Sequence, residues 1–363
     1  MSMPLNQADL SNRYAGLLVG TAVGDALGLP AEGISRQRIQ SCWHGQWRHR
    51  LVFGRGMISD DTEHTLFVAQ ALLAHPDDAV AFQRCLAWKL RLWLLGAPAG
   101  VGLATLRAIM KLWLGFSPAR SGVYSAGNGP AMRSALIGAC FCDAPEKRRA
   151  FISAATRLTH TDLRAETAAL AVAEAAAWAM QAKESAATFA ASLPGLSADS
   201  EWQKLCGQIQ QSLAAQLSVT AFADALGLAK GVSGYAYHSV PVALYAVLRH
   251  EHDFSEALRS ALDCGGDTDT VGAIVGALAG ARLGASAIPG EWVSGIWEWP
   301  RSVTLLQMIA ERLAKQKAVG TVLGPVSYFW PGLILRNILF ILVVLAHGFA
   351  RLWPWWGRGT GRT

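Results

Sequence analysis

The stretch Cys264-Gly265-Gly266-Asp267-Thr268-Asp269-Thr270 joins two segments of helical character, an amphipathic one over residues 254–262 and an apolar, small-residue one over 271–283. Its two glycines permit a turn that other residues rarely make. After the turn, Asp267 and Asp269 stand two positions apart, so both carboxylates can face one point. Two unpaired carboxylates about 4 Å apart repel by roughly 4 kcal/mol at an effective dielectric near 20. The pattern predicts two helices joined by a cation-binding turn; the alternative is a turn whose Asp or Thr only caps the next helix.

A second acidic cluster, Ser59-Asp60-Asp61-Thr62, follows a loop with Gly54 and Gly56 and opens a predicted helix over residues 63–74. Capping that helix needs only one of these side chains. The chain thus repeats one arrangement, an Asp pair beside hydroxyl groups at a helix start. If the two clusters meet, they supply enough oxygens for two metal ions about 3.5–4 Å apart, and oxygen ligands favour Mg²⁺, Mn²⁺ or Ca²⁺ over zinc. The predicted metal ligands are Ser59, Asp60, Asp61, Asp267, Asp269 and Thr270.

Residues 20–32, GTAVGDALGLPAE, are mostly small and apolar, but they include two carboxylates, Asp25 and Glu32. A helix is expected to end near Gly28 and Pro30 and to deliver Glu32 just beyond its end. Asp25, inside the helix, is either a buried hydrogen-bonding residue or a group that supports metal ligands. For Glu32, the alternative to a functional role is an ordinary surface loop residue.

A glycine-rich turn, residues 125–133 (SAGNGPAMR), runs into a predicted helix. Its backbone N–H groups can form a nest, and the helix N-terminus adds positive potential that suits a diphosphate. A GNG turn can equally be structural. His160, before an Ala-rich helix, is either a satisfied helix-end residue or part of a site.

Together these stretches resemble the ADP-ribosylglycohydrolase family. GDALGLPAE is similar to its first motif, SDDT to its second and GGDTDT to its third, in the family's order between about Tyr14 and Leu283. The resemblance implies a compact orthogonal multi-helix bundle, two divalent cations (Mg²⁺ or Mn²⁺), and a histidine, here His160, that borders the ADP-ribose cleft. The implied catalytic residues are Glu32, Asp60 and Asp61. The implied substrate-binding residues are Ser125, Gly127, Asn128, Gly129 and His160.

The implied activity is metal-dependent removal of mono-ADP-ribose from modified protein side chains, with arginine as the expected acceptor and cleavage at C1″ of the distal ribose. Serine-linked ADP-ribose, O-acetyl-ADP-ribose and poly-ADP-ribose are alternatives, because the motifs form the shared ADP-ribose end of the site. The catalytic route, by direct attack of water or by ribose ring opening, also stays open. A further alternative is an immunity protein that neutralises an ADP-ribosyltransferase toxin by reversal or by binding. A non-catalytic relative, as in an eye-lens crystallin, is disfavoured because every acidic motif position is present.

The composition indicates a folded, all-α chain. Of 363 residues, 52% are hydrophobic and 16% charged, which excludes a disordered protein. Helical spacing marks residues 165–182, 202–217 and 221–230, residues 193–200 indicate a loop, and alternating strand patterns are nearly absent.

The formal net charge is +6, but the basic residues are scattered without the motifs of a nucleic-acid binder, so no nucleic-acid partner is expected. A positive field would favour an anionic ADP-ribose ligand. The six cysteines form no CxxC pair, and no signal peptide is recognised, so we expect a reducing cytoplasm.

The catalytic domain is expected to span residues 1–320, and residues 321–363 form an apolar segment with Trp and Arg residues at its end. The uninterrupted apolar run 338–346 is shorter than the roughly 20 residues that span a bilayer, and Arg336 and His347 flank it. This segment is therefore expected to insert marginally into a membrane, to lie in the membrane interface, to pack onto the catalytic domain or to cover a partner.

Overall fold

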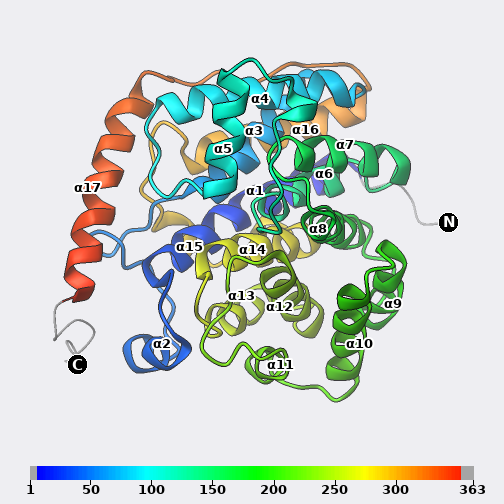
Figure 1. Cartoon of the computed structure of the whole chain (residues 1–363), viewed down its shortest axis with the longest axis vertical. Helices are drawn as coiled ribbons and strands as arrows, with labels where there is room; N and C mark the ends of the chain where they lie inside the picture. The colour runs from blue at the N-terminus through cyan, green and yellow to red at the C-terminus, as the bar shows by residue number, and fades with distance from the viewer. Residues whose placement is uncertain (1–5, 353–363) are drawn as a thin grey trace.

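Two helices, α1 (Gln7–Gly28) and α14 (Thr268–Leu283), run along each other at the centre of the computed structural model, and the other helices surround them (Figure 1). The structure describes residues 6–352; the Trp- and Arg-rich end of the chain lies outside this range. Within the described residues there are isolated backbone bridges but no β-strands. The predicted all-α, multi-helix fold is confirmed.

The remaining α-helices are α2 (Arg36–Trp43), α3 (Asp60–Ala74), α4 (Ala79–Leu95), α5 (Leu103–Trp113), α6 (Ala135–Cys140), α7 (Pro145–Arg157), α8 (Leu163–Gln181), α9 (Ala186–Ser192), α10 (Ser200–Ala214), α11 (Val219–Ala225), α12 (Ala236–Arg249), α13 (Phe254–Leu262), α15 (Gly290–Ser294), α16 (Val303–Val319) and α17 (Gly332–Leu352). Short 3₁₀ turns are η1 (Leu29–Ala31), η2 (Pro118–Arg120), η3 (Ala131–Arg133), η4 (Leu193–Leu196) and η5 (Ala285–Ala287).

Most helix boundaries follow the sequence pattern. Gly265 and Gly266 both adopt positive φ angles, +71° and +84°, so the turn between α13 and α14 has the backbone that the two glycines predict. Two expectations were wrong. The helix expected over residues 221–230 ends at Ala225, because Gly227 turns the chain with φ +79°. Residues 193–200, expected to be a loop, begin with the 3₁₀ turn η4.

The contact between α1 and α14 is made by glycines on both helices. Gly16, Gly20 and Gly24 of α1 lie against the backbone of Gly280, Gly276 and Gly272 of α14. A Cβ atom added to any of the three α1 glycines would come closer than 3.0 Å to the opposing carbonyl oxygen. Small residues at this spacing let two helix backbones touch, which no larger side chain would permit.

This glycine seam fixes the place where the first and third acidic motifs meet. At its end, the Thr268 hydroxyl donates to the Gly28 carbonyl at 2.8 Å. The chain beyond η1 then pairs with the GGDTDT turn, since Gly33 N–H donates to Gly266 and Gly266 N–H donates to Ile34, both at 2.8 Å. The loop that carries Glu32 is thereby attached to the start of α14.

In the part of the chain that the structure describes, two helices, α1 and α17, are by length and composition long and apolar enough to cross a membrane. The apolar window of α1 is 94% buried in the centre of the fold, whereas that of α17 is 17% buried. In Figure 1, α17 runs along one side of the molecule, after an extended connection from α16. The division of the chain at residue 320 stays a prediction.

We expect Gly20→Ala to lower the free energy of unfolding by about 1–3 kcal/mol, because its methyl group has no room against Gly276. Urea unfolding measures the change. Gly207→Ala is the matched control: Gly207 lies inside α10, and an added Cβ meets nothing within 4 Å in the described structure. The control should gain up to about 1 kcal/mol from helix propensity. Equal effects of the two substitutions would contradict close packing at the seam.

Candidate functional site

Asp25 fixes the turn that carries the second acidic motif. Its carboxylate accepts hydrogen bonds from Ser59 N–H at 2.9 Å, from Thr62 N–H at 3.2 Å and from the Thr62 hydroxyl at 2.5 Å. Burial raises the pKa of Asp25 to about 6, and these hydrogen bonds oppose the rise. Because Asp25 belongs to α1, the glycine seam also determines where the start of α3 lies. The sequence left two roles open for Asp25. The structure shows that Asp25 is buried and hydrogen-bonded to the turn of the second motif; its support of metal ligands stays a prediction.

The second and third motifs come into contact. Asp61 Oδ2 accepts from the Ser59 hydroxyl at 3.1 Å and from the Thr270 hydroxyl at 3.4 Å, which joins the first turn of α3 to that of α14. Asp267 Oδ2 accepts from Asn128 Nδ2 at 2.6 Å, which adds the glycine-rich turn to the same place. The structure thus brings together residues that the sequence places far apart. We call Asp60, Asp61, Asp267 and Asp269 the acidic cluster.

Burial and mutual repulsion disfavour the charged forms of these carboxylates. Burial raises the pKa of Asp61 well above its usual range, and Asp60 and Asp25 raise it further. The pKa of Asp269 is raised in the same way, by burial first and then by Glu32 and Asp267. A cluster with this much unbalanced negative charge favours a positive ligand.

The donor atoms of the acidic cluster fit a hard divalent cation. Asp61 Oδ1 and Asp269 Oδ1 are buried with no hydrogen-bond partner among the described residues. Helix capping accounts for Ser59, whose hydroxyl accepts from Asp61 N–H, but not for these two oxygens. In residues 6–352 no three His, Cys, Asp or Glu side chains already stand in a ligand arrangement. A bound cation would therefore have to draw the carboxylates together, with hydroxyl oxygens completing its shell.

Glu32 lies at the exposed edge of the cluster. It follows η1, and its side chain is accessible to solvent. Loss of solvation raises the pKa of its carboxyl, the Asp267 carboxylate raises it further, and Arg351 opposes the rise. The position joins solvent to the buried carboxylates, which suits a residue that contacts substrate.

His160 packs beneath the glycine-rich turn. Ideal Cβ atoms on Gly127 and Gly129 would each stand 3.2 Å from the imidazole, so the two glycines make room for the ring. The ring is buried, and Nδ1 lies 2.9 Å from the Thr159 hydroxyl. Burial, with Arg133 nearby, lowers the pKa of His160 to about 3, so the ring is neutral at physiological pH.

The glycine-rich turn offers fewer backbone N–H groups to a phosphate than the sequence suggested. Gly127 N–H donates to the Ser125 hydroxyl at 3.3 Å, and Asn128 N–H donates to the Gly234 carbonyl at 3.0 Å. The expected helix after the turn is only the 3₁₀ turn η3 followed by the six-residue α6. A strong helix dipole is therefore absent from this part of the described site. The assignment of Ser125, Gly127, Asn128, Gly129 and His160 to substrate binding stays a prediction.

Polar side chains of α17 hold the loop that carries Glu32. Arg351 donates to the carbonyl of Glu32 at 2.8 Å and to that of Pro30 at 2.6 Å. His347 Nε2 lies 3.1 Å from the same Pro30 oxygen. Charge-assisted hydrogen bonds of this kind are stronger than neutral ones, so the end of α17 fixes the backbone on which Glu32 stands.

The start of α17 holds the loop before the second motif. Arg336 contacts both carboxylate oxygens of Glu298 through Nε at 3.1 Å and donates to the Ile58 carbonyl at 2.5 Å. Glu298 in turn accepts from Ile58 N–H at 3.2 Å. Ile58 directly precedes Ser59, so α17 supports the approaches to both Glu32 and the acidic cluster.

Sequence reasoning missed Arg336, His347, Arg351 and Glu298 as residues that position the site. The only signal was that polar residues interrupt the apolar run of α17, and that signal has several explanations. Their partners lie far away in the chain, so no local pattern identifies them.

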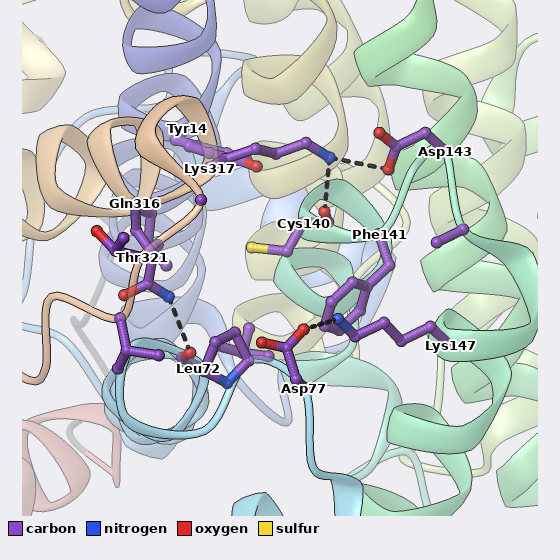
Figure 2. A pocket seen from close by; sticks show the side chains of 15 residues that line it. Tyr14, Leu72, Asp77, Cys140, Phe141, Asp143, Lys147, Gln316, Lys317 and Thr321 are labelled. Carbon is purple, nitrogen blue, oxygen red and sulfur yellow. Dashed lines mark hydrogen bonds and ion pairs between the residues drawn. The ribbon is translucent and has the colours of Figure 1, made fainter.

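A pocket of about 280 Å³, apart from the acidic cluster, lies beside Tyr14 of α1 (Figure 2). Lys317 there contacts Asp143 at 2.9 Å and donates to the Cys140 carbonyl at 3.0 Å. Burial raises the pKa of the Cys140 thiol to about 12, so no reactive thiolate forms. The charged groups of this pocket pair with one another. Tyr14 precedes the end of α1 by a helix rise of roughly 20 Å, so the pocket lies away from the acidic motifs. We assign the chemistry to the acidic cluster.

We expect Arg351→Met to raise amide hydrogen exchange in residues 29–34 by about tenfold, because charge-assisted hydrogen bonds typically contribute about 1.5–3 kcal/mol. Mass spectrometry of peptides from this loop measures the rate. Arg312→Met is the matched control, since Arg312 Nε also donates to a loop carbonyl, that of Gly324 at 2.7 Å, near the opposite end of α1. Unchanged exchange at residues 29–34 in the Arg351 variant would show that α17 does not hold the loop.

Comparison with known proteins gives the family. The profile of the ADP-ribosylglycohydrolase family matches residues 6–321. An uncharacterized protein of Archaeoglobus fulgidus is 30% identical over 308 residues, which are 79% of this chain and 92% of that protein. ADP-ribosyl-[dinitrogen reductase] glycohydrolase of Rhodospirillum rubrum is 27% identical, with 78% of this chain and 90% of that protein covered.

ADP-ribosylhydrolase ARH3 of Gallus gallus is also 27% identical, over 77% of this chain and 88% of that protein. A solved structure titled ADP-ribosylglycohydrolase-related protein complex covers 85% of this chain and 99% of its own, with a TM-score of 0.59 and 27% identity. The family match ends ten residues before Pro331 and so leaves α17 outside. This chain therefore belongs to the ADP-ribosylglycohydrolase family, whose members remove ADP-ribose from modified substrates.

Proposed function

We propose that this protein is a metal-dependent hydrolase that removes mono-ADP-ribose from modified protein side chains, with arginine as the acceptor. The bond broken is the one at C1″ of the distal ribose. The observation that carries the proposal is the meeting of α3 and α14 at their first turns, where Asp61 Oδ1 and Asp269 Oδ1 are buried and unpartnered in the described structure. Such oxygens are suited to binding a cation and, through it, the hydroxyls of a ribose.

Ser59, Asp60, Asp61, Asp267, Asp269 and Thr270 would hold two divalent cations, Mg²⁺ or Mn²⁺. Bound there, the cations would supply Lewis acid chemistry that makes water a better nucleophile near neutral pH. Asp25 keeps the Ser59–Thr62 turn in place from α1. Glu32, at the solvent edge of the cluster, holds the substrate or moves a proton between water and substrate, a contribution of about 10²–10⁴-fold in rate.

The remaining site residues suit the ADP-ribose part of the substrate. Asn128 donates to Asp267 and so joins the glycine-rich turn to the acidic cluster, which puts both beside the same part of the substrate in this proposal. His160 is neutral and packs under Gly127 and Gly129, so it supports the glycine-rich turn without adding a charge. These groups suit the ADP-ribose that all such substrates share. The choice of acceptor side chain would then depend on other residues around the site.

Two alternatives concern the acceptor and the partner. The relative from Gallus gallus is named an ADP-ribosylhydrolase without an acceptor, so serine-linked ADP-ribose and O-acetyl-ADP-ribose stand as rival substrates. The structural neighbour is titled a protein complex, and a role for this chain as an immunity protein, with an ADP-ribosyltransferase toxin as partner, stands as the second alternative. We place the protein in the cytoplasm.

We expect EDTA to abolish hydrolysis of arginine-linked ADP-ribose and Mg²⁺ or Mn²⁺ to restore it, with Zn²⁺ restoring it poorly, because the donors are hard oxygens. Release of ADP-ribose from arginine-linked and serine-linked substrates, measured side by side, tests metal and acceptor together. Full turnover by metal-free protein would refute the metal site. Cleavage of the serine-linked substrate alone would refute the arginine assignment and keep the hydrolase.

We expect Asp61→Asn and Asp269→Asn each to remove most activity, and the double variant to lose far less than the product of the two factors, because the residues act as one unit. Both substitutions should also raise the thermal midpoint of EDTA-treated protein, since each removes one repelling carboxylate. Asp78→Asn is the control, because Asp78 caps α4 at the surface. Multiplicative activity losses would mean that the two motifs form separate sites.

A further inference from the structure

The outward side of α17 is an apolar face that no described part of the chain covers. Leu335, Ile338, Leu342, Leu345 and Phe349 recur every three or four residues, and each is more than half exposed. The mean hydropathy of Gly332–Arg351 is 2.1. A continuous apolar surface of this kind on a folded protein marks an interaction site. We call these five residues the outer face of α17.

We propose that the outer face of α17 docks on the surface of an anionic lipid bilayer, with the helix lying in the plane of the membrane. The polar residues of α17 indicate that the helix lies on the membrane and does not span it. Arg336 and Arg351 are bound to Glu298 and to the Glu32 loop, and both sit on the side opposite the outer face. A spanning helix would have to leave the protein, bring Arg336 into the lipid and strand the buried Glu298. A helix that keeps these bonds presents only its apolar side, as interfacial helices do.

The breadth of the apolar surface favours lipid over a second copy of the chain. A two-helix seam needs only a narrow stripe, with charged residues beside it that pair across the interface. Here the positions beside the outer face, Ile334 and Leu339, are also apolar and about half exposed. A partner helix would leave such flanks in water, whereas a bilayer covers all of them and requires no hydrogen bonds in return.

An apolar cavity continues the outer face at the start of α17. Its volume is about 430 Å³, and α3, α4, α17 and the segment before α17 line it with mostly apolar side chains, among them Leu92, Trp93, Trp330 and Ile334. Trp330 and Ile334 are exposed as well, so the cavity opens onto the docking surface. Its volume and mostly apolar lining suit an acyl chain that reaches in from the lipid.

Charge and aromatic residues at the two ends of α17 match an anionic headgroup layer. Lys89 lines the cavity at the start of the helix, and the exposed Arg38 donates to the Arg351 carbonyl at its end. Residues 332–352 contain no acidic side chain. Trp330, 67% exposed, stands where Trp is enriched in membrane proteins, at the level of the headgroups.

Vesicle flotation of the full chain tests the proposal with two compositions, phosphatidylcholine alone and phosphatidylcholine mixed with phosphatidylglycerol. We expect binding to the mixed vesicles, weaker binding to the neutral ones, and loss of binding by more than about tenfold in the double variant L335E/L342E, since burying one Leu already corresponds to that factor. The control M308E/V319E places the same charges on two exposed apolar residues of α16 and should bind as the unchanged protein does.

Thermal midpoint and circular dichroism show whether L335E/L342E is folded, and light scattering gives its mass without lipid. The proposal is overturned if the unchanged protein stays unbound with mixed vesicles, or if the folded L335E/L342E variant binds as well as the control. It is also overturned if the unchanged protein is a dimer that L335E/L342E alone converts to monomers, because the outer face then binds a second copy. None of these readouts depends on hydrolysis, so the docking surface and the proposed activity fail or succeed separately.

Discussion

Backbone contact between α1 and α14 is the constraint on which the site depends. Because these positions are glycines on both helices, no side chains hold the two backbones apart. The close contact fixes the position of one helix relative to the other. Because the helices touch along their length, Gly28 of α1 meets Thr268 of α14, and the loop after η1 pairs with the GGDTDT turn. Asp25, on the same helix, holds the turn of the second motif. One packing contact therefore sets the relative positions of all three acidic motifs.

That constraint explains how carboxylates that repel one another stay close. Bringing them together costs free energy, which shows in the raised pKa values of Asp61 and Asp269. A large buried core, built on α1 and α14, offsets this cost. The site is thus held by packing that does not depend on its own electrostatics, and the uncompensated charge is what gives it affinity for a cation.

The sequence predicted the acidic turns, the bounds of α13 and the all-α fold, because each rests on local chemistry: glycines that permit a turn, and hydroxyls that cap a helix. It placed the starts of α3 and α14 at residues 63 and 271, three residues after the observed starts at Asp60 and Thr268. It did not predict the role of Arg351 or of Arg336. Arg351 donates to the backbone carbonyl of Glu32, and Arg336 donates to that of Ile58 as well as to the Glu298 carboxylate. Any residue offers a carbonyl, and Glu298 lies 38 residues before Arg336, so no local sequence pattern marks these acceptors. The same limit applies to the phosphate nest, where Gly234 takes an N–H group that the local pattern leaves open.

The two sides of α17 join the surface of the protein to its site. The inner side holds the backbone of Glu32, at the exposed edge of the acidic cluster, and the outer side is apolar. If the outer face rests on a membrane, Glu32, which the end of α17 holds, lies near the plane of the lipid headgroups. Side chains on proteins at that surface would then reach Glu32 more readily than those on proteins in free solution. Acceptor choice would follow from where the enzyme is held, which is consistent with a site whose motifs recognise only the shared ADP-ribose.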